Sequence, residues 1–403
     1  MAMLLERTAL RGPCAARPVE GAELPFLSLD TPTGPLHART RRLTAAHRTG
    51  RAPIVAAHSA SATLLALLAL DPTLAACDPR RALYLDTETT GLHGGAGTIA
   101  FLVGLAYWDT GTSPGPGGRD LILEQLLVRN LGEEAPMLER VAERMKDASM
   151  LVTFNGKSFD LPLLRTRFVM ARIPAPPEPP HLDLMHIARR LHRARGIECR
   201  LTTIEEKILG FVRQDDVPSG EVSASYLHFL RTGSVRSLLG VVEHNAWDVV
   251  AMAALVGLYG EPLEGTQLAA EDLTGLARTL KKAGQLDGAF DAASLAVERG
   301  GGHASLRARA EIAKARGDRA RALCDFELLA DQVDSSDVRL ELAKLYEHFV
   351  KEPALARDLV LKGTGEDETR TRRRLDRLER KSSRTRQRSL FVERRPHRGK
   401  SPP

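Results

Sequence analysis

A single run of residues, Ala82–Leu92, constrains this chain more than any other part of it. The run reads ALYLDTETTGL, an apolar stretch that ends in two carboxylates two positions apart, Asp86 and Glu88. Residues i and i+2 of a β-strand point to the same face, so we expect these side chains to lie side by side. Adjacent carboxylates repel each other unless a positive charge lies between them, and a divalent cation is the usual one. The sequence therefore predicts a strand that ends at a cation site.

The residues around this strand have the pattern of an α/β domain. Apolar runs at 81–86, 99–107 and 120–128 predict strands, and Gly-rich segments separate them. An amphipathic helix follows, because apolar residues recur on one helical face from Met137 to Met145. The other predicted elements are strands at 27–31, 150–154 and 181–184, and helices at 59–70, 161–171 and 234–258.

Residues 266–362 differ from this domain, because their pattern is purely helical and rich in alanine. Three turn-like segments recur at spacings of 33 and 34 residues, beginning at Gly284, Gly317 and Lys351. This period is typical of tetratricopeptide repeats, whose helical hairpins stack into a solenoid. An ordinary α-helical bundle is the alternative interpretation.

Positive charge is concentrated at the C-terminus. The chain carries a net charge of +6, but Thr369–Pro403 alone has 14 Lys/Arg against three acids, a local net of +11 that leaves −5 for the rest. We expect residues 363–403 to form a basic, disordered tail. Such a segment can also attract the phosphates of nucleic acid.

Cysteine usage and hydropathy exclude several classes of protein. The four cysteines lie far apart without a CxxC pair, which argues against a zinc ribbon or a disulfide framework. No secretory signal pattern is present, and the longest apolar run, 62–70, falls short of the ~20 residues that span a bilayer. We therefore expect a cytoplasmic protein, divided into an N-terminal segment at 1–79, an α/β domain at 80–260, a helical domain at 266–362 and the tail at 363–403.

Two further segments carry polar residues suited to a metal site. Asn155 and Asp160 follow the strand predicted at 150–154, although Asp160 would also serve as a helix N-cap. His244 and Asp248 are four residues apart in a predicted helix and so share one face, as a solvated pair also would. Each segment is weak evidence alone, but their order after the strand at 82–92 points to one site.

This order of motifs, DxE, then NxxxxD, then a His before a last Asp, resembles that of the DEDD 3′–5′ exonucleases. Within that group the chain is most similar to the YprB-like ribonuclease-H-like proteins, over about residues 24–258. The resemblance implies a mixed sheet flanked by helices. The words that carry it are LDTETTGL at 85–92, FLVGLAYW at 101–108, TFNGKSFDLPLLRTRF at 153–168, HLDLMHIARRL at 181–191, CRLTTIEEKILGF at 199–211 and HNAWD at 244–248.

The resemblance also implies a site for two ions, Mg²⁺ or Mn²⁺. Asp86 would bridge both ions, Glu88 and Asp248 would complete the ligands of the first, and Asp160 would hold the second through water. The chemistry agrees, because two cations can activate water at neutral pH and offset charge on the leaving oxygen of a phosphodiester. Carboxylates without a cysteine or histidine cluster also favour hard ions over zinc.

His244 departs from the family pattern. Members with His place it five residues before the last Asp, and members with Tyr place that residue four before, which is the spacing seen here. His244 could accept the proton of the attacking water, or it could only orient water or pack. Thr89, Gly91 and Leu92 would meet the terminal nucleotide. Asn155 would either bond near the scissile phosphate or fix its turn.

We therefore expect a metal-dependent nuclease, and specifically a 3′–5′ exonuclease that acts on single-stranded ends of DNA or RNA. A structure-specific endonuclease is an alternative, because a fold does not fix a function. A nucleic-acid-binding scaffold without catalysis is a third possibility, although clustered carboxylates argue against it. The helical repeat would offer a surface to a protein partner, and no membrane partner is expected.

Overall fold

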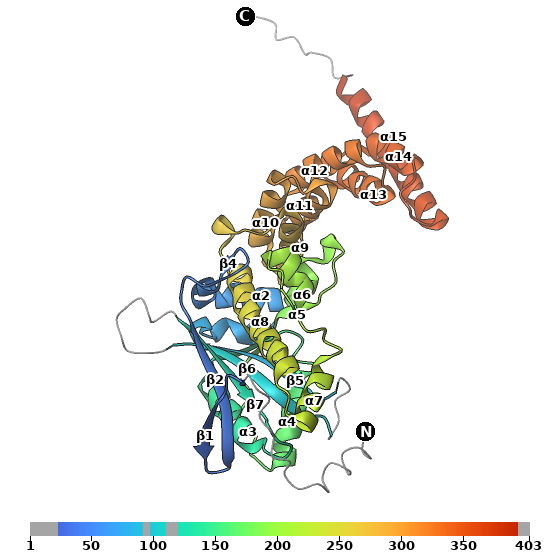
Figure 1. Cartoon of the computed structure of the whole chain (residues 1–403). Helices are drawn as coiled ribbons and strands as arrows, with labels where there is room; N and C mark the ends of the chain where they lie inside the picture. Colours follow the sequence, from blue (N-terminus) through green and yellow to red (C-terminus); the bar gives the residue numbers. More distant parts are fainter. Residues whose placement is uncertain (1–22, 92–96, 110–119, 394–403) are drawn as a thin grey trace, which may run out of the picture. The chain divides into compact units, whose positions relative to one another are not determined.

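The protein is described by a computed structural model that covers residues 23–91, 97–109 and 120–393, with the side chains from 384 onward excluded (Figure 1). The described residues divide into two compact units, with the boundary between Leu268 and Ala269. Each unit is considered by itself below.

The first unit is built on a seven-stranded mixed sheet, as the sequence predicts for the α/β region. Its strand order is β1-β2-β7-β6-β5-β8-β9, and β5 is antiparallel to β6 and parallel to β8. The strands are β1 (Leu27–Thr31), β2 (Gly34–Leu43), β5 (Ala82–Thr89), β6 (Ala100–Trp108), β7 (Leu121–Leu127), β8 (Met150–Thr153) and β9 (His181–Asp183).

Helices cover both faces of this sheet (Figure 1). Leu83 and Leu85 of β5 pack in one core with α3 (Ala135–Asp147) and α4 (Asp160–Ala171). On the other face, Leu102 of β6 packs with α7 (Val222–Thr232) and α8 (Arg236–Tyr259). Because neighbouring residues of a strand point to opposite faces, Asp86 and Glu88 fall on the face that α8 covers.

The N-terminal segment, which we expect from the sequence to be partly packed on the α/β domain, supplies two strands of the main sheet. β2 pairs with β7 along its length, from His37 opposite Leu127 to Leu43 opposite Leu121. The helix predicted at 59–70 is divided. It consists of the end of a 3-10 turn, η1 (Ile54–Ser59), and α2 (Ala62–Ala69), which begins where the Ser61 hydroxyl accepts the Leu64 N–H.

Short elements complete the first unit. They are β3 (Arg48–Thr49), β4 (Ala52–Pro53), η2 (Pro72–Ala76), η3 (Pro79–Arg81), α5 (Leu184–Leu191), η5 (Arg193–Arg195), α6 (Leu201–Ile204), the π-helical η6 (Glu205–Leu209) and η7 (Leu263–Gly265). Among all these helices, α8 is long and apolar enough to cross a membrane by length and composition. However, 72% of its most apolar window is buried inside the protein, as in the central helix of a folded core.

The second unit is a succession of antiparallel helices, each packed on the next along the chain. They are α9 (Ala270–Lys282), α10 (Leu286–Glu298), α11 (Gly302–Arg316), α12 (Arg319–Gln332), α13 (Ser336–Leu345) with the π-helical η8 (Tyr346–Val350), α14 (Pro353–Leu361) and α15 (Glu368–Glu393). Gly284, Gly317 and Lys351 stand at equivalent turns, with φ of 82°, 86° and 69°. The region is therefore helical with a recurring turn, and its tetratricopeptide character stays a prediction.

The prediction of a disordered tail from residue 363 is wrong for most of that segment. Residues Glu368–Glu393 form α15, and Leu378 on this helix is fully buried against Ala343, Ala356 and Val360. A charged composition did not exclude a helix, because Leu375 and Leu378 pack against the preceding helices. Several of its cations also bond to a buried acid, Glu347. Residues 394–403 lie outside the described part of the chain.

Candidate functional site

Two carboxylates of the candidate site come from the end of β5, an inner strand of the sheet between β6 and β8. Asp86 lies opposite Gly104 of β6, and Glu88 lies opposite Leu102. The pairing shifts between Glu88 and Thr89, so the strand leaves its regular register immediately beyond the two acids. Such irregularities often occur beside functional sites, where they redirect side chains.

A third carboxylate, Asp160, is brought to this strand by α4. Asp160 is the first residue of α4, but its side chain does not cap the helix. Instead, its Oδ1 accepts a hydrogen bond of 2.6 Å from the hydroxyl of Thr87, the residue between the two acids of β5. A strand and a helix that are far apart in sequence are thus joined at the site.

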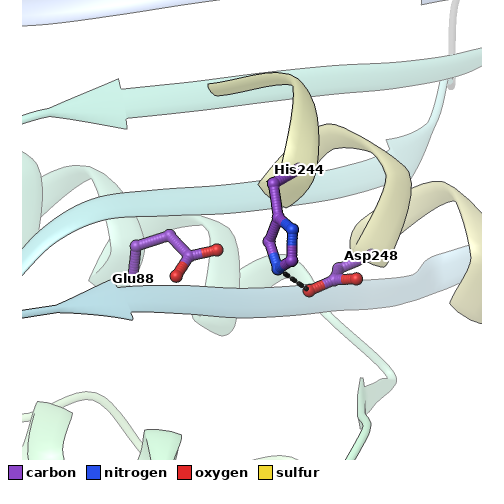
Figure 2. Close-up of side chains that lie close together, drawn as sticks. All are labelled: Glu88, His244 and Asp248. Atoms are coloured by element: carbon purple, nitrogen blue, oxygen red, sulfur yellow. Dashed lines mark ion pairs between the residues drawn. The ribbon is translucent and has the colours of Figure 1, made fainter. Parts of the chain in front are cut away.

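α8 supplies the remaining two predicted residues, His244 and Asp248, which lie one helical turn apart. Figure 2 shows the imidazole of His244 between the carboxylates of Glu88 and Asp248. His244 Nε2 lies 3.5 Å from Asp248 Oδ2. Ligand atoms of these three residues all lie within 4.8 Å of one another, a spacing that one metal ion could bridge.

The tautomer of His244 follows from its second contact. Nδ1 lies 2.6 Å from Oδ1 of Asp216, a carboxylate that can only accept a hydrogen bond when ionised. Nδ1 also lies 3.3 Å from Arg213 Nη1, but the shorter contact with Asp216 assigns the proton to Nδ1, and Nε2 then keeps its lone pair toward Glu88 and Asp248. A ring oriented in this way can bind a cation or accept a proton through Nε2.

Asn245, the residue after His244, orients Asp86. Its side-chain Nδ2 donates to Asp86 Oδ2 at 2.8 Å, while its Oδ1 accepts from Gln125 Nε2 at 3.0 Å. Asn245 is fully buried, and a Cβ at Gly104 would lie only 2.3 Å from Asn245 Oδ1. Glycine at position 104 is thus what allows this amide to approach the strand.

One cation of the chain also enters the cluster. Arg213 donates hydrogen bonds to Asp248 Oδ1 and to both oxygens of Glu205, and its side chain is 4% exposed. Its Nη1 lies 3.4 Å from Asp216 Oδ2. Arg213 therefore offsets part of the negative charge of the site from behind Asp248.

The pKa values of the carboxylates reflect their crowding. Burial, together with the charges of Asp248, Glu88 and Asp160, raises the pKa of Asp86 well above its ordinary value. Burial and the charges of Asp248 and Asp160 raise the pKa of Glu88 to about 8, against the opposing charge of Arg213. Burial raises the pKa of Asp160 to about 6, although the Thr87 hydrogen bond lowers it. A divalent cation would relieve this repulsion, and the donor set of carboxylates and one imidazole suits it.

All of these acids open onto one cavity of about 390 Å³. Its walls include every predicted site residue that the structure describes: Asp86, Glu88, Thr89, Gly91, Asn155, Asp160, His244 and Asp248. Leu92, the remaining predicted residue, lies outside the described residues.

The backbone of Asn155 helps to hold the turn that follows β8. This residue adopts a φ of 71°, and its N–H donates to Asp183 Oδ1 at 2.8 Å. Asp183 also accepts from Met185 N at the start of α5, so it serves as a helix cap rather than as a fifth acid of the site. The backbone of Asn155 fixes the turn, while its side chain lines the cavity.

Comparison with known proteins agrees with this geometry. Residues 83–259 match the RNase_H superfamily. This stretch of the chain forms a ribonuclease-H-like domain. It contains every acid of the candidate site.

A curated relative supports the same assignment. The ribonuclease-H-like domain is similar to the uncharacterized protein YprB of Bacillus subtilis (strain 168), with 37% identity over 176 residues. The similarity covers 43% of this chain and 40% of that protein, so it does not extend to the whole of either.

Sequence reasoning missed several residues that the structure places at the site. They are Thr87, Glu205, Arg213, Asp216 and Asn245. Gly104 within a buried strand was a signal for a close approach such as that of Asn245. Arg213 and Asp216 gave no such signal, because they follow a short helix in a charged stretch that also suits a solvated loop.

Proposed function

We propose that the ribonuclease-H-like domain is a metal-dependent nuclease, and that it removes nucleotides from the 3′ ends of single strands. The observation that carries the proposal is the convergence of four carboxylates, from β5, α4 and α8, on the wall of one cavity. So many acids are unfavourable for stability alone, since burial and mutual repulsion raise the pKa of at least three of them.

The carboxylates would hold two divalent cations, Mg²⁺ or Mn²⁺. Asp86 would contribute to both ions, Glu88 and Asp248 to the first, and Asp160 to the second. When bound, such ions lower the pKa of water and offset the charge that develops on a leaving oxygen. Asn245 would keep Asp86 in place through its hydrogen bond of 2.8 Å.

His244 is positioned to accept a proton from the attacking water. Its Nδ1 proton is held by Asp216, so Nε2 faces the cavity with its lone pair. An imidazole nitrogen with a free lone pair is a common general base. The spacing of four residues between His244 and Asp248 is compatible with this role, since both side chains meet on one face of α8.

The cavity also suits a single terminal nucleotide. Its volume of about 390 Å³ lies in the ~300–1,000 Å³ range of small-ligand pockets, whereas a duplex requires an open groove. Phe159, beside Asp160, is 55% exposed and lines the cavity. An aromatic ring in this place can stack on a base, which commonly contributes ~1–3 kcal/mol and tolerates any sequence.

The proposal is tested with single-stranded DNA and RNA carrying a label at the 5′ end, incubated with Mn²⁺ or Mg²⁺. We expect a ladder of products that shorten from the 3′ end, and no cleavage of a circular single strand. Cleavage of the circle would establish an endonuclease instead. Binding of nucleic acid without any cleavage would leave only a scaffold role.

Matched variants exclude a contaminating nuclease. Asp248→Asn should abolish the ladder, whereas Glu143→Gln, whose side chain is 62% exposed on α3, should cleave as the wild type does. Equal activity in the Asp248→Asn protein would refute the assignment of the site.

A further inference from the structure

We propose that Arg213 is a positioning residue of the metal site, which holds one oxygen of Asp248 so that only the other oxygen faces a divalent cation. The inference rests on the proposed function of the cavity as a metal-dependent site. Arg213 lies outside the motifs that suggested the site, and it contributes no ligand atom of its own.

The two oxygens of Asp248 have different surroundings. Oδ1 accepts a hydrogen bond from Nη2 of Arg213. Oδ2 lies 3.5 Å from His244 Nε2, the contact that the dashed line in Figure 2 marks, on the side of the carboxylate that faces His244 and Glu88. A carboxylate fixed in this way offers a single oxygen in a defined direction, which is how hydrogen-bonded partners orient metal ligands elsewhere.

The guanidinium itself is held rigidly by Glu205. Nε of Arg213 donates to Glu205 Oε2 at 2.6 Å, and Nη2 donates to Oε1 at 2.8 Å. Glu205 has no exposed side-chain surface. One hydrogen of Nη2 thus serves Glu205 and the other serves Asp248. A lysine cannot reproduce this arrangement, because it presents a point charge on a flexible stem.

The backbone explains why Arg213 reaches this place. Glu205 is the first residue of η6, a π-helical segment of about one turn, and Gly210 caps its end with a φ of 70°. The chain then reverses, and Phe211 N donates to Glu205 O at 2.9 Å. π-Helical turns occur often at functional sites, and this one brings Arg213 back over the residue that anchors it.

A second loop secures the turn. Arg51 N donates to Leu209 O at 2.8 Å, and a Cβ at Gly50 would lie 2.1 Å from that same carbonyl oxygen. The φ of 56° at Gly50 is also one that glycine adopts most readily. Arg213 is therefore carried by a segment that is tied to the core, as a positioning residue requires.

Two other roles for Arg213 predict different results. If it only neutralised negative charge, its loss would strengthen cation binding, because a repelling charge would be gone. If it only paired with Glu205 for stability, its replacement would lower the melting temperature and leave cation binding as it was. Positioning of Asp248 predicts weaker cation binding even when the positive charge is kept.

The test is the affinity of the full-length Arg213→Lys protein for Mn²⁺, measured by titration calorimetry without nucleic acid. We expect a Kd raised ~10-fold or more, the usual cost of losing a group that orients a metal ligand. The matched control is Arg309→Lys, which alters another buried arginine, paired to Asp325 at 2.8 and 2.9 Å in the helical unit. This control should lower stability without changing the Kd.

An unchanged or lower Kd in Arg213→Lys would overturn the inference. If that protein does not fold, Glu205→Gln keeps Arg213 but weakens its anchor. Its Kd should then rise at least ~3-fold, and a Kd equal to that of the wild type would equally overturn the inference. A wild type that binds Mn²⁺ but cuts no nucleic acid would refute the proposed nuclease and leave the role of Arg213 standing. A wild type that binds no Mn²⁺ would refute both.

Discussion

Two buried groups of charges in this protein have opposite balances. At and beside the candidate site, six acids stand against one cation, Arg213, which bonds to three of them. The six are Asp86, Glu88, Asp160, Glu205, Asp216 and Asp248. In the helical unit, the balance is reversed, with three cations around one buried acid, Glu347. Its carboxylate accepts hydrogen bonds from Arg377 at 2.6 Å and Lys381 at 2.7 Å, and Arg374 lies 3.7 Å away.

The consequence appears in the pKa values. Burial alone would raise the pKa of Glu347, but the hydrogen bonds from Arg377 and Lys381 lower it to about 2. At the candidate site, burial and neighbouring acids raise the pKa of Glu88 to about 8. Burial is common to both groups, so the number of nearby cations decides the sign. The buried charges of the helical unit are neutralised from within the chain, whereas the candidate site holds more acids than the chain's own cations can neutralise, as the proposed cation site requires.

The substitution Asp86→Asn tests most directly whether the acids of the candidate site serve activity rather than stability. We expect the rate of 3′-end cleavage to fall at least ~10²-fold, because electrostatic stabilisation of a transition state commonly contributes that much. The free energy of unfolding without metal should stay the same or rise, since the substitution removes one of several repelling carboxylates. Cleavage of a 5′-labelled oligonucleotide and chemical denaturation measure the two quantities.

A large loss of stability in Asp86→Asn would contradict the comparison, because it would mean that the acid is neutralised internally. Asparagine is a conservative replacement at position 86, because its side-chain oxygen can still accept the hydrogen bond that Asn245 Nδ2 donates to Asp86 Oδ2 at 2.8 Å.

The converse experiment is Glu347→Gln in the helical unit. Loss of the buried charge leaves Arg377 and Lys381 without their acceptor, so we expect the free energy of unfolding to fall by ~1–3 kcal/mol. Both tryptophans, Trp108 and Trp247, belong to the first unit, so their fluorescence reports on that unit alone. The fluorescence transition and the cleavage rate should not change, while the far-ultraviolet circular dichroism transition should move to lower denaturant. A fall in cleavage would show that the two units are coupled.

The same comparison predicts how stability depends on pH. The folded pKa of Glu88, about 8, exceeds the ~4.3 of an unfolded glutamate, so the folded state holds a proton that the unfolded chain releases. Its contribution is fully present below about pH 4.3 and is lost as pH rises through about 8, by at most ~1.4 kcal/mol per unit. Without metal, the first unit should therefore melt at lower temperature as pH rises from about 5 to about 8.

Mn²⁺ should remove most of this pH dependence, because a cation takes the place of the proton and binds best to ionised carboxylates. The measurement is the tryptophan-detected melting temperature across that pH range, with Mn²⁺ and with a chelator. A melting temperature that rises with pH in the chelator would contradict the raised pKa of Glu88.

The sequence was sufficient to predict elements with a strong local pattern. β1 has the predicted bounds, and the amphipathic helix around Met137 and Met145 is present as α3. Strand periodicity placed Asp86 and Glu88 on one face, whereas Asp160 and Asp248 were added through the order of motifs and the family resemblance. The helix α15 was missed because its burial depends on Leu378, a residue whose neighbours come from distant helices.

Residues of the site were missed for the same reason, since their contacts join positions far apart in the sequence. Arg213 reaches Asp248 across 35 positions of sequence, through a π-helical turn that no local pattern announces. Asp216 meets His244 across 28 positions. Contacts of this kind depend on how the chain returns to the sheet, and periodicity carries no information about that path.

The smallest expected effect, and the most specific, is that of Thr87→Val. Valine keeps the shape of threonine but removes the hydroxyl that donates to Asp160 Oδ1 at 2.6 Å. That hydrogen bond lowers the pKa of Asp160, which burial otherwise raises, so its loss should move the pKa above about 6. Fewer molecules would then hold an ionised Asp160 near pH 6, whereas at about pH 8 nearly all would still do so. We expect cleavage to fall ~3-fold near pH 6, because losing a hydrogen bond of ~1 kcal/mol lowers the ionised fraction of Asp160 from about a half to about a sixth, and we expect little change at about pH 8. Thr87→Ser retains the hydroxyl and should behave as the wild type at both values. An equal loss at both pH values in Thr87→Val would mean that the hydroxyl only shapes the strand, and Asp160 would then have to be ionised independently of Thr87.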